Sequence, residues 1–390
     1  PLAIELAAAR LALFSLPSLL QELTAGDYAS LVLLQSEVRD RPQRQRSLRD
    51  TIAWSYELLS TEEQALFSRL SVFVGSFTLD AAKAINAVGQ SNGDAAARST
   101  LVILTALVVK TLIVSTPQPD GTTRFRMLNL VREFAAEMLA AREDVTPIRQ
   151  AHAQWYAALA TEADAALTGP DQVQWLDRLS AEAANLHVAI SWSIAAREVE
   201  VAYTFGATLL LFWRRRNRLS DGWFWLTEIL TLPQDAAPVT LQAKVLLNTG
   251  IMAMLIGNYP AVEHFLVNSI TLARQSNDSA ILSYALGRLG RLRFGNHEYA
   301  QANALYEEAM RLGEESNNRW ELGLALTGLG QNYWGIGDKA KSLQFTQAGL
   351  EEFRRLGDIW GIAFASTKVA NTLIQQRRFV EAQVYAQESL

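Results

Sequence analysis

The fold of this chain is decided by a forty-residue pattern that is clearest over 241–360. Three stretches carry it: LQAKVLLNTGIMAMLIGNYPAVEHFLVNSITLARQSNDSA at 241–280, ILSYALGRLGRLRFGNHEYAQANALYEEAMRLGEESNNRW at 281–320 and ELGLALTGLGQNYWGIGDKAKSLQFTQAGLEEFRRLGDIW at 321–360. A small residue recurs at Gly250, Gly290, Gly330 and Ala370. A large apolar residue recurs at Ile190, Leu230, Ile270, Met310, Leu350 and Leu390. Several columns in one register indicate an internal repeat.

Forty residues suit two helices of roughly 14–18 residues joined by short turns. Small residues let the two helices of such a hairpin approach closely, and turn residues keep the same period at Asn277-Asp278, Asn317-Asn318 and Gly357-Asp358. We therefore predict an α-solenoid over 146–390, with the last unit cut at its C-terminal end. The units ending near 190 and 230 fit less well, because Glu182 and Gly222 replace a small apolar residue.

The segment before the repeats has a different pattern. Ser60-Thr61-Glu62-Glu63 has the spacing of a capping box and predicts the start of a helix. Helices are expected before and after it, and then two strands over 112–116 and 124–127 with turn residues between them. A further helix is expected from Asn129 to about Ala141. This order predicts a winged-helix domain over 46–142 in a mainly α protein.

Composition excludes several functional classes. The 390 residues carry 35 Lys+Arg against 40 Asp+Glu, so no overall basic excess favours nucleic acid or an anionic membrane. Cysteine is absent, which excludes disulfides and thiolate metal sites and fits a cytoplasmic location. The longest uncharged apolar stretch, 201–213, is too short to span a membrane. The four histidines are far apart in sequence, so we expect neither a metal site nor a catalytic centre.

The repeat columns resemble tetratricopeptide repeats in a long, forty-residue form. Pro1-Leu2-Ala3-Ile4-Glu5-Leu6 resembles a stretch of STAND-class signalling ATPases of the NB-ARC kind. Ser47-Leu48-Arg49, Trp54-Ser55-Tyr56 and the RLSVF sequence at 69–73 resemble the winged helix of large bacterial LuxR-type ATP-binding regulators. The stretch FRMLNLVREFA at 125–135 is similar to the last strand and helix of that domain.

The resemblance implies a segment of a longer regulator in which a nucleotide-binding domain precedes this chain. Residues 1–30 would end its small helical domain, and 31–45 would be an Arg-rich linker. Pro1 would be a remnant of the adenine pocket. The chain has no G-x-x-x-x-G-K-[ST] phosphate loop, so we expect no enzyme activity and no cofactor here, whereas the full-length regulator would bind ATP or ADP with Mg²⁺.

Three residues would serve as interdomain or nucleotide-sensing positions in the winged helix: Arg49, Leu128 and Asn129. Many relatives carry a Met-His-Asp motif where this chain has Met127-Leu128-Asn129. A leucine cannot hydrogen-bond a phosphate as an imidazole can, and the sequence leaves open whether this domain senses nucleotide.

Two clusters of arginines suggest phosphate contacts but have simpler interpretations. Residues 39–49 are interpreted as a solvated hinge rather than a phosphate-binding linker. Residues 212–218 mix arginines with aromatic residues, as single-strand-binding proteins do. The favoured interpretation is that a long apolar helix ends there with cations at its C-terminus. Trp320 and Trp360 lie forty residues apart and are expected to be packing residues.

These patterns favour a regulatory, sensing function. In this interpretation the repeats bind a protein, a peptide or a small inducer on their concave face. The winged helix then relays binding to the nucleotide-binding domain, and DNA is contacted only through a further tail. The alternatives are a stand-alone tetratricopeptide scaffold and, less favoured, a winged helix that reads DNA. In tetratricopeptide proteins the first helix of each hairpin faces the groove, which suggests these groove residues: Asn248, Met252, Arg288, Leu292, Arg293, Gln331 and Tyr333.

Overall fold

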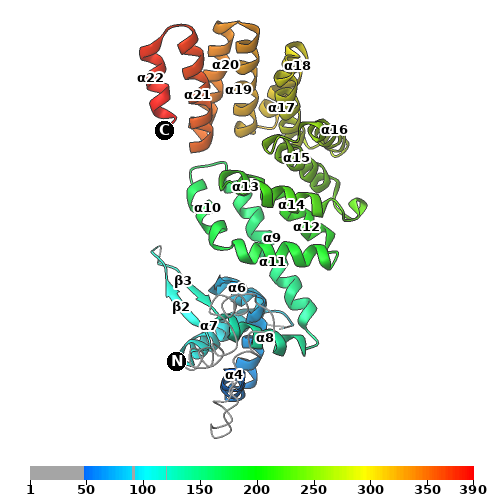
Figure 1. Cartoon of the computed structure of the whole chain (residues 1–390), viewed down its shortest axis with the longest axis vertical. Helices are drawn as coiled ribbons and strands as arrows, with labels where there is room; N and C mark the ends of the chain where they lie inside the picture. The colour runs from blue at the N-terminus through cyan, green and yellow to red at the C-terminus, as the bar shows by residue number, and fades with distance from the viewer. Residues whose placement is uncertain (1–47, 90–92, 120) are drawn as a thin grey trace, which may run out of the picture. The chain divides into compact units, whose positions relative to one another are not determined.

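The computed structural model describes residues 48–89, 93–119 and 121–390 (Figure 1). The chain forms two compact units. One contains the described residues up to Tyr156 together with Glu182–Ala189, and the other contains Ala157–Ala181 and Ile190–Leu390. The predicted mainly α class, with a winged helix followed by a helical solenoid, is confirmed. The predictions for Pro1, 1–30 and 31–45, and the start of the 46–142 domain, lie outside the described residues.

The first unit is built on five helices and a three-stranded sheet within its described part up to residue 140. The Ser60 side chain accepts a hydrogen bond from Glu63 N, and the Glu63 carboxylate accepts one from Ser60 N, so the predicted capping box is confirmed. The core contains Leu66, Phe67 and Phe134. The elements in order are α4 (Leu48–Glu57), α5 (Thr61–Arg69), η2 (Leu70–Val72), β1 (Ser76–Thr78), α6 (Leu79–Asn86), α7 (Gly93–Val109), β2 (Val114–Pro117), β3 (Thr123–Arg126) and α8 (Asn129–Ala140).

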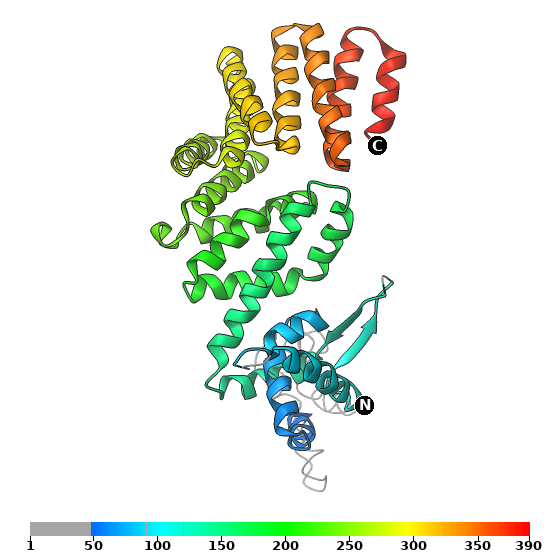
Figure 2. The same ribbon diagram turned by 180° about the vertical axis from the view of Figure 1, so that it is seen from behind.

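The wing is an antiparallel sheet with strand order β1-β3-β2. The β2–β3 hairpin was predicted from its turn residues, and it extends beyond the helices of this unit in both ribbon views (Figure 1, Figure 2). Strand β1 was not predicted, because three residues show too little alternation to reveal a strand. It pairs with β3 and places Phe77 opposite Phe125, where Phe77 is fully buried.

A buried carboxylate joins Glu182–Ala189 to the wing. Glu182 pairs with Arg124 Nη1 at 2.7 Å and accepts hydrogen bonds from Tyr156 Oη at 2.9 Å and Asn185 Nδ2 at 3.0 Å. Arg124 also donates to the Ser76 hydroxyl and carbonyl of β1. The residue that fits the repeat pattern poorly therefore has a structural role in the first unit. The two compact units divide the chain at other points than the predicted 46–142 and 146–390 segments.

The second unit begins with helices of unequal length that do not follow the regular hairpin pattern. Helices α9 (Val145–Ala166) and α11 (Ala183–Ala195) each contribute residues to both units. The prediction of one long apolar helix through 201–213 is wrong, because the helix is interrupted at Leu209. The reason lies in the side chain of Asn248, which donates to the carbonyls of Gly206 and Ala207 at 2.9 Å each. The other elements here are α10 (Gln172–Ala181), α12 (Val199–Thr208), α13 (Leu210–Arg215), α14 (Leu219–Ile229) and η3 (Gln234–Ala236).

Regular hairpins follow from residue 239 onward and pack side by side (Figure 1). The predicted turn columns are confirmed: Asn277, Asn317 and Gly357 adopt positive φ, and the next residue caps the following helix. Asp278, for example, accepts a hydrogen bond from Ile281 N at 2.9 Å. The hairpin helices are α15 (Val239–Leu255), α16 (Tyr259–Gln275), α17 (Ser279–Gly295), α18 (Tyr299–Glu315), α19 (Arg319–Ile336), α20 (Lys339–Leu356), α21 (Ile359–Gln375) and α22 (Phe379–Glu388).

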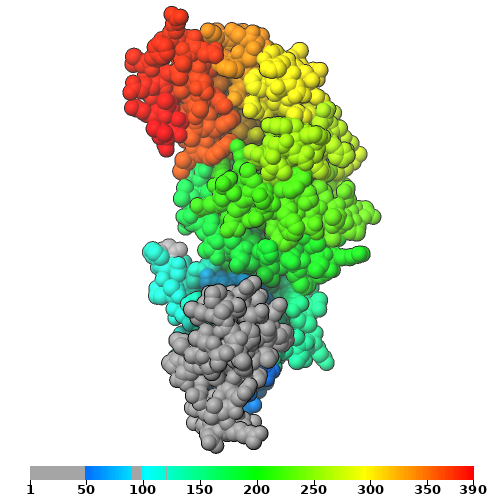
Figure 3. Space-filling view, viewed as in Figure 1, coloured from blue at the N-terminus to red at the C-terminus, as the bar shows by residue number. Residues whose placement is uncertain are grey.

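The glycines of the repeat columns permit close helix approach, as predicted. A Cβ atom at Gly330 would lie 2.9 Å from both Ser342 O and Thr346 N in the backbone of the partner helix α20. Across the same pair of helices, a Cβ atom at Gly349 would lie 2.8 Å from Gly323 O. Side chains of successive hairpins close the gaps that the ribbons leave between them (Figure 3).

One buried carboxylate joins distant parts of the second unit. Asp358 is fully buried and caps α21 by accepting from Gly361 N at 3.1 Å. It also accepts from Trp320 Nε1 at 2.7 Å and from Gln172 Nε2 at 3.1 Å. The Arg215 guanidinium lies 3.6 Å away and is itself buried. Segments near residues 172, 215, 320 and 358 therefore meet at a single side chain.

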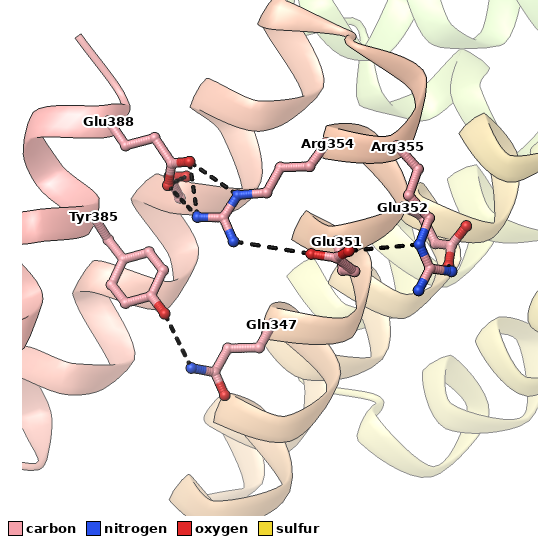
Figure 4. Close-up of polar contacts among 8 residues, drawn as sticks. Gln347, Glu351, Glu352, Arg354, Arg355, Tyr385 and Glu388 are labelled. Carbon is pink, nitrogen blue, oxygen red and sulfur yellow. Dashed lines mark hydrogen bonds and ion pairs between the residues drawn. The ribbon is translucent and has the colours of Figure 1, made fainter.

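Polar contacts on the outer helices add to this packing. The Arg354 guanidinium bonds both oxygens of Glu388 at 2.8 Å, and Gln347 donates to Tyr385 Oη at 3.3 Å (Figure 4). Arg274 and Glu308, also 34 residues apart, make the same kind of pair at 3.0 Å. Because these groups are largely exposed, each pair contributes at most about 1 kcal/mol.

Substituting Asp358 tests whether this carboxylate holds the second unit together. Asp358→Asn keeps a capping oxygen but leaves buried Arg215 without a countercharge. We expect the free energy of unfolding in urea to fall by about 2–4 kcal/mol. Asp338→Asn is the matched control, because Asp338 caps only its own helix, at Lys341 N. That control should change stability by under about 0.5 kcal/mol. Equal losses of unfolding free energy in the two variants would show that Asp358 stabilises the unit only as a helix cap.

A second pair of variants tests close helix approach. Gly330→Ala would force backbone atoms of α20 away, and we expect a loss of about 1–3 kcal/mol. Gly287→Ala has open space around the new methyl group and should gain about 0.5–1 kcal/mol from helix propensity. Thermal and urea unfolding of both variants would check this, and a neutral Gly330→Ala would contradict it.

Candidate ligand-binding cavity in the repeats

The second unit contains a cavity of about 570 Å³ among its repeat helices. The first helices of successive hairpins, α15, α17, α19 and α21, supply most of its lining, and α13 contributes Arg214. Two smaller cavities of about 380 and 360 Å³ share lining residues with it: Tyr284 and Glu321 in one, Gln331 and Lys368 in the other. The three cavities therefore follow one face of the repeats.

Positive charge dominates the largest cavity. Its basic lining residues are Arg214, Arg288, Arg291 and Lys368. Within the described part of the chain, none of these four forms an ion pair. Burial lowers the pKa of Arg214 to about 10. The charges of Arg288 and Arg215 also lower it, whereas Tyr284 and Asp358 raise it. Burial also lowers the pKa of Lys368, followed by the charge of Arg291.

Aromatic rings hold these cations in place. The Arg288 guanidinium lies 4.7 Å from the centre of the Tyr284 ring, and that of Arg214 lies 4.2 Å from the Trp360 ring. Lys368 Nζ lies 5.5 Å from the Phe364 ring. Such cation–π contacts orient a cation without neutralising it, so the charge remains available to an anion.

Three buried polar atoms at this cavity have no hydrogen-bond partner among the described residues: Tyr284 Oη, Arg288 Nε and Glu321 Oε2. Burial raises the pKa of Glu321 to about 8, with Asp278 raising it further and Lys244 lowering it. At neutral pH this carboxyl is mostly protonated and does not balance the four cations. Unsatisfied buried polar groups are costly, and they often mark places where a ligand or solvent binds.

The structure brings together three of the seven groove residues predicted from sequence. Arg288, Leu292 and Gln331 all line the largest cavity. Asn248 borders the second cavity, but its amide is committed to the carbonyls of Gly206 and Ala207.

The other three predicted groove residues lie elsewhere. Met252 is fully buried, and a Cβ atom on Gly222 would lie 2.5 Å from its methyl carbon. Arg293 and Tyr333 do not line the largest cavity, and the side chain of each contacts other residues. Arg293 pairs with Glu263, and Tyr333 stacks on Phe345 at 5.5 Å between ring centres.

The sequence analysis missed several cavity residues, although the repeat register contains a signal for them. In α17 the lining positions 284, 288 and 291 lie on one face of the helix. The equivalent positions in the next two repeats, forty and eighty residues later, also line the cavities. These positions are Tyr284, Leu324 and Phe364, then Arg288, Gly328 and Lys368, then Arg291, Gln331 and Asn371. Arg214 could not be found in this way, because it lies in the irregular helices.

The arginine cluster at 212–218 is mostly engaged within the second unit. Arg215 faces Asp358, Arg216 pairs with Asp177, and Arg218 lies 3.7 Å from Asp221. This supports packing over single-strand binding for the cluster. Trp320 and Trp360 are also packing residues: Trp320 bonds Asp358, and Trp360 stacks on Phe364.

The three predicted sensing residues lie in the first unit. Arg49 Nη2 donates to the Glu137 carboxylate of α8 at 2.6 Å. Leu128 precedes α8 with its side chain 48% exposed, and Asn129, the first residue of α8, is exposed as well. Leu128 and Asn129 are therefore accessible, whereas Arg49 helps to attach α4 to α8.

The described residues contain no group of three or more His, Cys, Asp or Glu placed to hold a metal ion. Within the same residues, every helix is too short or too polar to cross a membrane.

The buried carboxyl of Glu321 predicts a pH dependence of stability. Its pKa is about 8 in the folded chain against 4.5 when unperturbed, so the folded state binds more protons between these values. The free energy of unfolding should therefore fall as pH rises from about 4.5 to 8. Glu321→Gln removes this term and should be more stable than the parent by about 4–5 kcal/mol at pH 9 but by less than about 1 kcal/mol at pH 5. Urea unfolding across pH 5–9 measures this. Glu314→Gln, at an exposed position, is the control, and parallel profiles for Glu321→Gln and the parent would contradict the prediction.

Comparisons with known proteins agree with this architecture. Residues 59–140 match the family model of the winged helix-turn-helix domain. Over 378 residues, 94% of the chain, the sequence is 32% identical to proposed HTH-type transcriptional regulators of Mycobacterium tuberculosis (strain H37Rv) and Mycobacterium bovis. The chain spans only 40% of the length of these relatives. An uncharacterised protein of M. tuberculosis is 39% identical over 140 residues, 36% of the chain and 34% of that protein.

A solved structure has a similar fold. It is the Signal Transduction ATPase with Numerous Domains (STAND) protein with a tetratricopeptide repeat sensor from Pyrococcus horikoshii. It matches with a TM-score of 0.52 and 16% identity, covering 99% of this chain and 59% of that one. The expected resemblance to STAND-class proteins is thus confirmed at the level of fold. The chain combines a winged helix-turn-helix domain with a tetratricopeptide-like solenoid, and it is homologous to proposed HTH-type transcriptional regulators.

Proposed function

We propose that this chain is the sensor and regulatory portion of a longer, ATP-binding bacterial transcriptional regulator of the STAND class, of the NB-ARC-like and LuxR-type kind. The repeats bind an effector, and the winged helix passes its presence to a nucleotide-binding domain outside the chain. The regulator acts in the cytoplasm, and its contacts with DNA are made by a further domain. The chain itself carries out no catalysis.

The cavity of the repeats is the observation that carries this proposal. It combines unpaired cations, aromatic rings and unsatisfied buried polar atoms in a volume typical of ligand sites. A tetratricopeptide scaffold that only holds proteins together needs no such polar cavity. The likeness to regulators and to a STAND fold supports placing this site in a switch.

The surface of α7 favours a regulatory contact over DNA reading by this winged helix. In a helix-turn-helix the second helix enters the major groove and offers polar and basic side chains. Helix α7 instead exposes Leu101, Val102 and Val109, which are 50%, 70% and 77% accessible, and its sequence contains one basic residue, Arg98. Exposed apolar side chains of this kind suit a protein partner, here the nucleotide-binding domain of the same regulator.

Calorimetric titration with ATP and ADP tests the proposal. The 390-residue chain is compared with a form extended N-terminally to include the upstream domain of its own gene. We expect Mg²⁺-dependent nucleotide binding by the extended form alone, because phosphate cradles of this class need a glycine-rich loop and a lysine that this chain does not contain. If neither form binds nucleotide, the chain is better described as a repeat scaffold. Mg²⁺-dependent binding by the short form would contradict the assignment of roles.

A further inference from the structure

The cations of the largest cavity come from separate elements that converge on one space. Arg288 and Arg291 lie on the same face of α17, Lys368 lies on α21, and Arg214 is in the last turn of α13. Burial is the main cause of the lowered pKa values of Arg214 and Lys368, and repulsion between neighbouring like charges adds to it. An arrangement of this kind is stabilised when an anion binds between the cations.

The cavity also has an apolar part and unused hydrogen-bonding groups. Tyr284 and Phe364 present ring surface, and Leu292 and Ala325 are among the apolar lining residues. Tyr284 Oη and Arg288 Nε are buried with no partner among the described residues, so both can donate to an oxygen acceptor.

The size of the cavity restricts its occupant. A volume of about 570 Å³ lies within the range of roughly 300–1,000 Å³ found for small-molecule sites. The two neighbouring cavities extend along the same face, but all four of these cations line the largest cavity. The observations therefore favour a compact ligand with concentrated negative charge.

We infer that this cavity binds a small organic anion whose phosphate or carboxylate groups are held by Arg288, Arg291, Lys368 and Arg214, and whose apolar body lies against Tyr284 and Phe364. This inference rests on the proposed sensor role and specifies the chemical class of the effector. The effector carries at least two negative charges, because fewer would leave most of the cations unpaired. Arg291 is exposed and lies at the rim, where it meets the ligand first.

Titration calorimetry of the full 390-residue chain with pyrophosphate and, separately, with citrate tests the inference. We expect at least one of these anions to bind, with an affinity that weakens as salt is added. Binding of pyrophosphate alone identifies a phosphate-bearing effector, and binding of citrate alone identifies a carboxylate. Each of these probes contains only the charged part of the inferred ligand, so 1-naphthyl phosphate serves as a third probe, an aromatic dianion that the others should displace.

Variants of α17 locate the binding. Arg288→Gln and Arg291→Gln should each weaken binding about tenfold, since each removes a charged donor to the anion. Arg293→Gln is the matched control on the same helix, because Arg293 points away from the cavity and pairs with Glu263. Unfolding curves show whether each variant folds. If Arg288→Gln does not fold, the affinity of the surface-exposed variant Arg291→Gln is compared with that of Arg293→Gln.

Three results would overturn the inference. The first is the absence of binding by all three probes at 10 mM, and the second is binding only by a glutamate-rich peptide. The third is an equal loss of affinity in Arg291→Gln and Arg293→Gln. These experiments use no nucleotide-binding domain. A negative result would therefore reject anion binding by the cavity without rejecting the proposed relay, and a positive result would not establish the relay.

Discussion

The second unit depends on the fully buried carboxylate of Asp358. A charge removed from water must be compensated locally, and here the compensation comes from far along the chain: Gln172, Arg215 and Trp320 all face it. The irregular helices near 172 and 215 are thereby fixed against the regular repeats. The cavity depends on the same contact, since Arg214 is adjacent to Arg215 and stacks on Trp360, two residues after Asp358.

Much of this fold is predictable because its rules are local. Close helix approach needs a small residue at one position, and a turn between helices needs positive φ followed by a cap, so both appear as forty-residue columns. The features that sequence did not reveal are set by distant residues. The break at Leu209 depends on Asn248, and the assignment of Glu182–Ala189 to the first unit depends on Arg124. Strand β1 exists only because β3 pairs with it.

The candidate site was less predictable than the fold. Sequence indicated which helices face the cavity but not which side of each helix does so, and an error of two residues turns a side chain through roughly 200°. Arg288 and Gln331 lie on the cavity side, whereas Arg293 and Tyr333 do not. The electrostatic character of the site could not be predicted either. It arises from the convergence of α13, α17 and α21, and from the burial that leaves Glu321 mostly neutral.

The residues that line the cavity and the residues that pack the hairpins occupy different columns of the repeat, and this has an evolutionary consequence. Duplicated repeats begin with identical residues in every column, so their differences record later divergence. The columns that pack the hairpins have stayed small, as at Gly290 and Gly330, whereas the column through Arg288, Gly328 and Lys368 has diversified in size and charge. These columns lie on different sides of the same helices, but Gly328 also packs closely, because a Cβ atom there would overlap Tyr306 Cε1. At Arg288 and Lys368, unlike at Gly328, substitution can therefore alter what the cavity recognises with little effect on how the hairpins stack.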